Sequence, residues 1–231
     1  MNKRKALPWR LYHVGDYFTD LALEILGGEK TAGSRDYGDI DNWYLDAQIE
    51  VKGCSNRNTL KIYKEQLERQ LSDLGFPFSN LLYAIFFYRN QWWDKTRSMS
   101  NETPTRAAMD IFLGNNIMRA FIVDGRVLAA IKEINGIRTE QHAGETHHSI
   151  RMSQGTLVGF IKKPEDTLKK FGLRDFKVFS YIARLKFRGQ VINFELTFIL
   201  HKKQLKNILD NFQLPLELKT QEEIEEEKLV L

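Results

Sequence analysis

Residues 35–52 of this chain read RDYGDIDNWYLDAQIEVK. Apolar and polar residues alternate from residue 47 to residue 52, which is typical of a β-strand that turns one face to a core. The apolar face would carry Ala47, Ile49 and Val51, and the opposite face Gln48, Glu50 and Lys52. A hairpin would return Asp39 to the neighbouring strand, close to Glu50. Two carboxylates and a lysine would then meet at one edge of a sheet.

This combination suits phosphodiester hydrolysis. Carboxylate oxygens are the ligands that Mg²⁺ takes, and a lysine beside them can orient or deprotonate the attacking water. Acid-x-Lys triplets also begin at Asp175, Glu217 and Glu226, but only Glu50 combines strand alternation with an upstream partner strand. The competing interpretation is a solvated strand face with Asp39 in a turn, since polar strand faces are common.

The flanking sequence predicts a layered α/β fold. Apolar residues recur at helical spacing over residues 16–26 and again over 60–74, behind a cap at Asn58-Thr59. The run 81–88 is apolar and aromatic, the pattern of a strand buried on both faces. Helix, hairpin, helix and buried strand in this order give a layered α/β core.

The second half is predicted to be rich in strands. Residues 91–106 are polar and fit a connection, and strands are expected at 118–123 and 126–134, about a turn at Asp124-Gly125. A further hairpin is expected over 177–200, turning at Arg188-Gly189-Gln190. The last predicted helix carries Leu205, Ile208, Leu209 and Phe212.

Gly38-Asp39-Ile40 followed by Ile49-Glu50-Val51-Lys52 resembles the motif of the PD-(D/E)XK nuclease superfamily, which includes restriction endonucleases and archaeal Holliday-junction resolvases. The resemblance covers roughly residues 15–90 in order of elements. It implies a restriction-endonuclease-like αβββαβ core with a mixed central sheet. Gly38 stands where the proline of the motif's name would be, a departure expected to affect backbone shape more than chemistry.

The resemblance also assigns roles to individual residues. Asp39 and Glu50 would hold Mg²⁺, for which Mn²⁺ would substitute, and Lys52 would be the catalytic lysine. Glu24 matches a glutamate that many members carry on the first helix near the metal. Val51 is included in the expected metal site.

Basic and aromatic residues outside this motif are candidate DNA contacts, because bases stack on aromatic rings and phosphates pair with cations. The candidates are Ser34, Arg35, Arg89, Trp92, Trp93, Lys95, Arg97, Arg184, Lys186 and Arg188. Tryptophans equally anchor loops, and charged strand faces are commonly solvated. Gln66 and Gln70 share one side of the second helix, where related nucleases sometimes place polar residues near the site.

Charge is unevenly divided along the 231 residues, whose formal net charge is +4. Residues 217–231 hold six glutamates and two lysines, a net charge of −4, so residues 1–216 carry +8. A basic body suits a polyanionic partner, and an acidic tail could cover it as a DNA mimic. A merely solubilising surface is the alternative.

The remaining features concern the compartment. The longest apolar run is far shorter than the roughly 20 residues of a membrane-spanning helix, and no signal-peptide core follows the basic N-terminus. Cys54 is the single cysteine, so neither an internal disulfide nor a standard zinc-finger spacing is available. We expect a cytoplasmic protein with no membrane partner.

These patterns together predict a metal-dependent endonuclease that hydrolyses double-stranded DNA. We expect a nuclease core over residues 1–110, a β-rich region for substrate recognition or dimerisation over 111–216, and an acidic tail over 217–231. The extra length favours a sequence-specific restriction-type enzyme, and two cuts in a duplex imply a homodimer. The alternatives are a Holliday-junction resolvase or other structure-specific repair nuclease, and a non-catalytic DNA-binding or recombination accessory protein.

Overall fold

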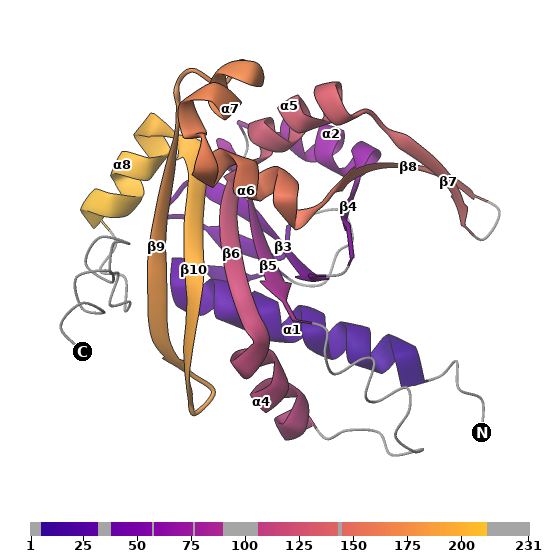
Figure 1. The fold of residues 1–231 in the computed structure, drawn as a ribbon, viewed down its shortest axis with the longest axis vertical. Coiled ribbons are helices and arrows are strands. Elements are labelled where there is room, and N and C mark those ends of the chain that lie inside the picture. The colour runs from indigo at the N-terminus through magenta and orange to yellow at the C-terminus, as the bar shows by residue number, and fades with distance from the viewer. Residues whose placement is uncertain are drawn as a thin grey trace.

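A mixed sheet of seven strands forms the centre of the computed structural model, which describes residues 6–31, 38–56, 58–75, 77–89, 106–142 and 145–211 (Figure 1). The strand order is β1-β2-β3-β5-β6-β10-β9. The strands are β1 (Glu29–Lys30), β2 (Ile40–Asn42), β3 (Ala47–Ser55), β5 (Asn80–Tyr88), β6 (Ile117–Asp124), β9 (Phe176–Phe187) and β10 (Gln190–His201).

The sheet combines hairpins with parallel crossovers. β1, β2 and β3 pair antiparallel, and β3 runs parallel to β5 after a crossover through β4 (Leu60–Tyr63) and α2 (Lys64–Ser72). β6 is antiparallel to β5 and parallel to β10, which forms a hairpin with β9. A second sheet of three strands, β4 with β8 (Glu145–Met152) and β7 (Arg138–His142), extends away from the centre (Figure 1).

Helices cover both faces of the central sheet, which gives three layers. One face packs against α1 (Ala6–Leu26), α4 (Arg106–Asn116) and α8 (Lys202–Asn211). The other packs against α2, α5 (Gly125–Asn135), α6 (Gln154–Lys162) and α7 (Pro164–Lys170). Both hydrophobic clusters contain residues from either side of position 110. None of the described helices is both long and apolar enough to cross a lipid bilayer.

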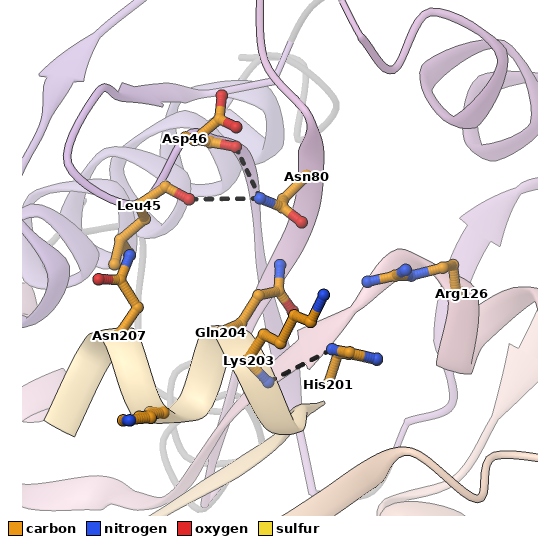
Figure 2. A pocket seen from close by; sticks show the side chains of 9 residues that line it. Leu45, Asp46, Asn80, Arg126, His201, Lys203, Gln204 and Asn207 are labelled. Carbon is orange, nitrogen blue, oxygen red and sulfur yellow. Dashed lines mark hydrogen bonds between the residues drawn. The ribbon is translucent and has the colours of Figure 1, made fainter.

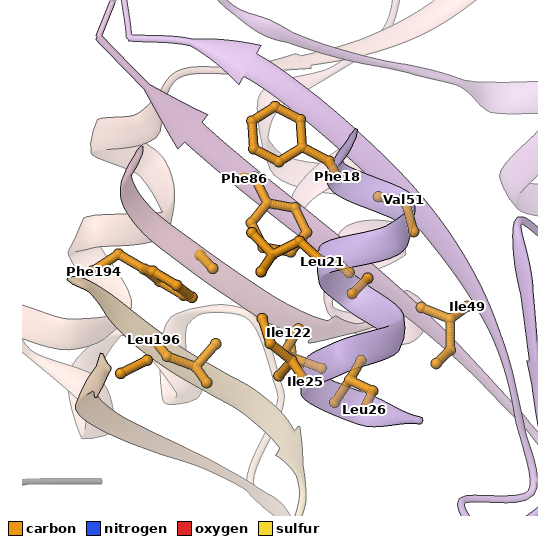
Figure 3. Packing of buried hydrophobic residues seen from close by; sticks show 14 of the residues in the cluster. Phe18, Leu21, Ile25, Leu26, Ile49, Val51, Phe86, Ile122, Phe194 and Leu196 are labelled. Atoms are coloured by element: carbon orange, nitrogen blue, oxygen red, sulfur yellow. The ribbon is translucent and has the colours of Figure 1, made fainter. Parts of the chain in front are cut away.

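The first helix fixes the position of the β2–β3 hairpin. Its apolar stripe lies on the face of β3 that carries Ile49 and Val51 (Figure 3). Gly53 allows this close packing, because a Cβ there would stand 2.5 Å from the Phe18 ring. The helix ends at Leu26, and Gly27 follows with φ 71°, in the left-handed region that favours glycine.

The predicted first helix, the hairpin that brings Asp39 to Glu50 and the buried strand are present, but the second helix begins later than expected. Residues 60–63 form strand β4, and α2 starts at Lys64, with no side-chain cap. Leu60 and Ile62 are both buried and pair with β8. Leu60 fits the helical series Leu60, Tyr63 and Leu67, but it also alternates with Ile62 as in a strand. The pairing partner lies about ninety residues away, so tertiary contact decided the outcome. The expected cap at Asn58-Thr59 is therefore wrong.

The predicted strand over residues 126–134 is also wrong, because this segment is helix α5. Asp124 caps the helix: its side chain accepts the backbone N–H of Arg126 at 2.9 Å. Val127 and Ile131 lie one helical turn apart and are fully buried. Asp-Gly therefore begins a helix here and does not turn a hairpin.

The late hairpin is confirmed. Twelve residues of β9 pair with twelve of β10, and the turn residues Arg188 and Gly189 have φ of 46° and 79°. Two consecutive positive φ values are the hallmark of the tight turn that matches strand twist. The final helix is confirmed as α8, which ends at Asn211. The expected connection over 91–105 and the acidic tail over 217–231 lie outside the described residues.

Candidate active site

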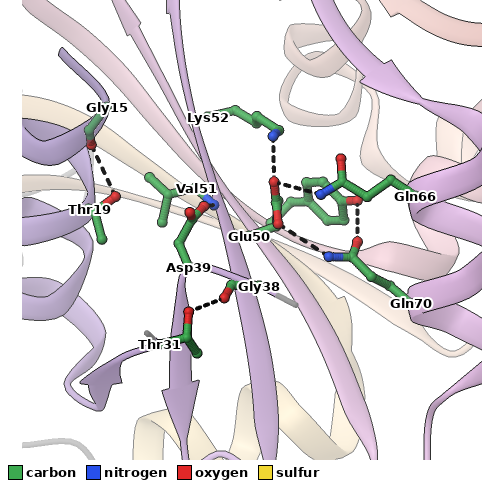
Figure 4. Close-up of polar contacts among 11 residues, drawn as sticks. Gly15, Thr19, Thr31, Gly38, Asp39, Glu50, Val51, Lys52, Gln66 and Gln70 are labelled. Carbon is green, nitrogen blue, oxygen red and sulfur yellow. Dashed lines mark hydrogen bonds and ion pairs between the residues drawn. The ribbon is translucent and has the colours of Figure 1, made fainter. Parts of the chain in front are cut away.

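Strand register places Asp39 opposite Glu50. Ile40 pairs with Ile49 in the antiparallel β2–β3 hairpin, so the preceding Asp39 faces Glu50 across the strands, and the two side chains share one face. Asp39 Oδ2 accepts the backbone N–H of Val51 at 2.7 Å (Figure 4). This bond holds the Asp39 carboxylate at the point where the hairpin opens.

Gly38 makes this close approach of the two strands possible. A Cβ at Gly38 would lie 2.7 Å from Gln48 Cγ and 2.8 Å from the Ile49 carbonyl oxygen. Those distances are shorter than side chains tolerate. A side chain at position 38 would therefore force the two strands apart, and glycine avoids this.

Glu50 lies in a polar pocket beneath α2. The residue is only 4 % exposed, and Oε1 accepts hydrogen bonds from Lys52 Nζ and, at 3.0 Å, from Gln66 Nε2. Oε2 accepts from Gln70 Nε2 at 3.2 Å. Tyr83, the register neighbour of Glu50 on β5, donates its hydroxyl to Gln70 Oε1 at 2.9 Å (Figure 4). A buried carboxylate is thus held by one cation and two amides.

Burial and mutual repulsion set the electrostatics of the site. Desolvation, and then the nearby charge of Glu50, raise the pKa of Asp39, against the opposing effects of the Val51 N–H and the Lys52 ammonium. Desolvation, and then the charges of Glu50 and Asp39, raise the pKa of Tyr83. The Tyr83 hydroxyl is therefore a hydrogen-bond donor at neutral pH. The site therefore brings two carboxylates together in a partly desolvated environment.

These residues fit a hard cation bound through oxygen. Two neighbouring carboxylates that repel each other favour a cation between them. A strand residue presents its N–H and C=O to the same neighbour, so the Val51 carbonyl faces the edge where its N–H meets Asp39. No group of three or more acidic, histidine or cysteine side chains placed to hold a metal occurs in the described part of the chain. Mg²⁺, which is commonly held by one or two carboxylates and keeps several waters, suits such a donor set.

Glu24, the further predicted ligand, does not contact the pair. It is exposed on α1, and within the described ranges it makes no hydrogen bond or ion pair. The side chains of Asp39 and Glu50 have their contacts with β3 and α2 instead. Glu24 therefore remains a sequence-based prediction without a structural contact to support it.

The predicted DNA contacts are spread over the chain. Ser34, Arg35, Trp92, Trp93, Lys95 and Arg97 lie outside the described residues. Arg89 is exposed directly after β5, and Arg184 and Lys186 are exposed on the edge strand β9. Arg188 instead joins three elements, because its guanidinium pairs with Asp20 of α1 and with Asp110 of α4 at 2.9 Å.

Gln66 and Gln70 are predicted from the sequence to share one side of the second helix, where related nucleases sometimes have polar residues near the site. Both lie in α2, one helical turn apart, and both donate to Glu50. Tyr83 was missed because it lies within the uniformly apolar run of β5. Its hydroxyl has a hydrogen-bond partner, Gln70, only because α2 packs above β5.

Comparisons of the chain with protein-family models, curated proteins and solved structures found no match.

Proposed function

We propose that this protein is a metal-dependent endonuclease that hydrolyses phosphodiester bonds of DNA, with a core of the PD-(D/E)XK type. The observation that carries the proposal is the placement of Asp39 opposite Glu50, with Lys52 on the same strand face. A lysine–glutamate pair on a solvated strand face would not be buried as Glu50 is. A hydrolytic site, in contrast, uses neighbouring carboxylates and a lysine together.

The order of elements supports the same proposal. α1 is followed by the three antiparallel strands β1–β3, then by α2 and by β5, which runs parallel to β3. Apart from the inserted strand β4, this is the αβββαβ order of the superfamily. Asp39 directly precedes the second of these strands and Glu50 lies on the third, close to the arrangement that the resemblance implies.

In the proposed reaction each side chain has a separate task. Bound Mg²⁺ would polarise the scissile phosphate and lower the pKa of a water. Asp39 and Glu50 would hold it, with Gln66 and Gln70 keeping Glu50 in place. Lys52, whose side chain is 26 % exposed, can orient the attacking water and offset the charge that develops on the phosphate oxygens. The water oxygen bonds to phosphorus, the opposite phosphorus–oxygen bond breaks, and the leaving sugar oxygen takes a proton.

The form we propose is a homodimer that cuts both strands at a specific sequence, with junction cleavage as the structure-specific alternative.

A non-catalytic DNA-binding protein is a second candidate, and one observation favours it. Both oxygens of Glu50 already accept hydrogen bonds, three in all. A catalytic Glu50 has to exchange at least one of these for the metal.

The proposal is tested by incubating the wild type and Lys52→Ala with supercoiled plasmid, linear DNA and a four-way junction, in Mg²⁺ and in EDTA. We expect cleavage by the wild type in Mg²⁺ only, and a loss of at least about 100-fold in the variant, the usual contribution of acid–base groups. Discrete bands from linear DNA would indicate the restriction type, and cleavage of the junction alone would indicate a resolvase.

Lys132→Ala is the matched control. Lys132 pairs with Glu68 of α2 at 2.7 Å, so its removal breaks another lysine–glutamate pair that involves this helix but leaves Asp39 and Glu50 intact. We expect this control to keep full cleavage. DNA that is bound in Mg²⁺ but left uncut by the wild type on every substrate would favour the non-catalytic candidate.

A further inference from the structure

A firmly anchored turn between β2 and β3 displays two aromatic side chains. Trp43 is 64 % exposed and Tyr44 is 87 % exposed. Asn42 Oδ1 accepts the Leu45 N–H at 2.9 Å, and the Leu45 side chain is buried. Asp46 accepts a backbone N–H from the segment before β5 at 3.0 Å. The turn is thus held in one conformation with both rings directed outward.

An open cavity of about 660 Å³ adjoins this turn (Figure 2). Leu45 and Asp46 line it on one side, and the first half of α8 lines it on the other. The start of β5, the first turn of α5 and the end of β10 complete its walls. The volume is in the range of small-ligand sites, roughly 300–1,000 Å³.

The cavity is positively charged. Arg126, Lys203 and Lys206 line it, and Asp46 is the one acidic side chain in the lining. Both lysines are exposed, and within the described ranges neither has an ion-pair partner. Arg126 is paired with Asp124 at 2.6 Å. Asp46 is a single carboxylate against these two lysines, so the lining keeps a net positive charge for an anionic ligand.

Two further polar groups in the wall lack a full set of partners. Both polar atoms of the Gln204 side-chain amide are buried, and in the described part of the chain they have no hydrogen-bond partner. A buried amide without hydrogen bonds is unfavourable, and because both atoms are inaccessible, the side chain has to turn toward the cavity before a ligand or water can satisfy it. His201 Nδ1 accepts the backbone N–H of Lys203 at 3.3 Å, and among the described residues Nε2 has no hydrogen-bond partner.

We infer that this cavity binds the phosphate groups of a single-stranded nucleic acid whose bases stack on Trp43 and Tyr44. Lysines that neutralise phosphates release counterions, and exposed aromatic rings accept any base by stacking. A duplex keeps its bases stacked inside, so an aromatic pair beside a cationic cavity suits a single strand. The Trp43 ring packs against the Phe78 ring, with ring centroids 4.5 Å apart, and this contact positions it for stacking.

The inferred site is separate from the proposed catalytic one. The cavity adjoins the turn of the β2–β3 hairpin, whereas Asp39 and Glu50 face each other beyond Ile40 and Ile49, at the opposite end of the paired segment. Binding in the cavity therefore does not depend on hydrolysis. It can be measured in EDTA, where the proposed nuclease is inactive.

The test is equilibrium binding of a fluorescein-labelled oligothymidylate in EDTA over a range of salt concentrations. We expect the double variant Lys203→Ala/Lys206→Ala to weaken binding by about tenfold and to lower the salt slope by about 1.4, since each phosphate contact on a single strand contributes about 0.7. Tyr44→Ala should weaken binding by about fivefold or more through lost stacking. All three side chains are exposed, so these variants should fold.

Lys162→Ala/Lys163→Ala is the control, because it removes two exposed lysines at the end of α6, away from the cavity. We expect it to bind as the wild type does. An unchanged affinity and salt slope in the Lys203/Lys206 variant would overturn the inference, as would an equal loss in the control. Competition by inorganic pyrophosphate together with normal binding by Tyr44→Ala would show a phosphate site only and overturn the nucleic-acid assignment.

Discussion

At the scale of single residues, the ionisation of Asp39 links pH to the stability of the fold. Desolvation and the charge of Glu50 raise its pKa, so the folded protein binds this proton more tightly than the unfolded chain does. The corresponding stability is present below the unfolded value of about 4 and is lost as pH rises through the folded pKa. In EDTA at neutral pH, Asp39→Asn should therefore raise the Tm, by about 2–4 °C for each kcal/mol of relieved repulsion.

The same variant tests the metal site, because Mg²⁺ should raise the Tm of the wild type and leave that of Asp39→Asn unchanged. Asp20→Asn is a control of opposite sign. Burial alone would raise the pKa of Asp20, but hydrogen bonds from Lys30 and Arg188 lower it, so its charge stabilises the fold above pH 4 or so. This control should lower the Tm at neutral pH and keep the response to Mg²⁺. Thermal unfolding across pH, with and without Mg²⁺, separates these outcomes.

At the scale of elements, the β2–β3 hairpin depends on the close contact of its two strands at Gly38. Gly38→Ala would press a Cβ against Gln48 and the Ile49 carbonyl, so we expect a loss of about 1–3 kcal/mol, as in other overpacked sites. The cleavage rate should fall more than the loss of folded protein alone would explain, because a shift of the strands at position 38 also displaces Asp39, the next residue. Gly159→Ala, in α6 with no atom within 4 Å of the added Cβ, should gain up to about 1 kcal/mol. Denaturant unfolding measures the free energy of unfolding of both variants. A Gly38→Ala variant as stable as the wild type would contradict the close strand contact.

The elements that the sequence predicts well are those whose pattern is local and complete. Residues 47–52 alternate and 81–88 are uniformly apolar, and both are strands. Leu60 fits a helical series with Tyr63 and Leu67 and a strand alternation with Ile62, and only the pairing with β8 makes this segment a strand. For the site, spacing alone suggested Asp39, Glu50 and Lys52 as a group. The contacts of Gln66, Gln70 and Tyr83 depend on how α2 lies over β5, which no local pattern encodes.

At the scale of the whole molecule, one sheet carries both sites at different places on the β2–β3 hairpin. Its open end holds the carboxylate pair, and its turn adjoins the cationic cavity. α1 clamps this hairpin on one face, and α2 holds Glu50 on the other. Strands from the second half extend the same sheet, and α8 supplies two lysines of the cavity. The second half therefore forms part of the central sheet and much of the lining of the cavity.

Charge is the last property of the whole chain to be tested. Residues 217–231 carry a net charge of −4 and follow a body of +8, and they lie outside the described residues. If this segment competes with DNA for the basic body, its deletion should strengthen duplex binding several-fold at about 50 mM salt and much less at about 200 mM, since salt screens such competition.

Fluorescence anisotropy with a labelled duplex in EDTA measures this effect without cleavage. The matched control keeps the length of the tail and replaces its six glutamates by glutamine. Because both changes remove the same acidic charges, they should strengthen binding similarly, with the deletion slightly weaker in effect since it also removes two lysines. A deletion that strengthens binding while the glutamine variant does not would assign the effect to bulk, and unchanged affinity in both at low salt would rule out competition by the tail. The expected pattern would make the acidic segment a built-in competitor that sets how much salt the protein tolerates on DNA.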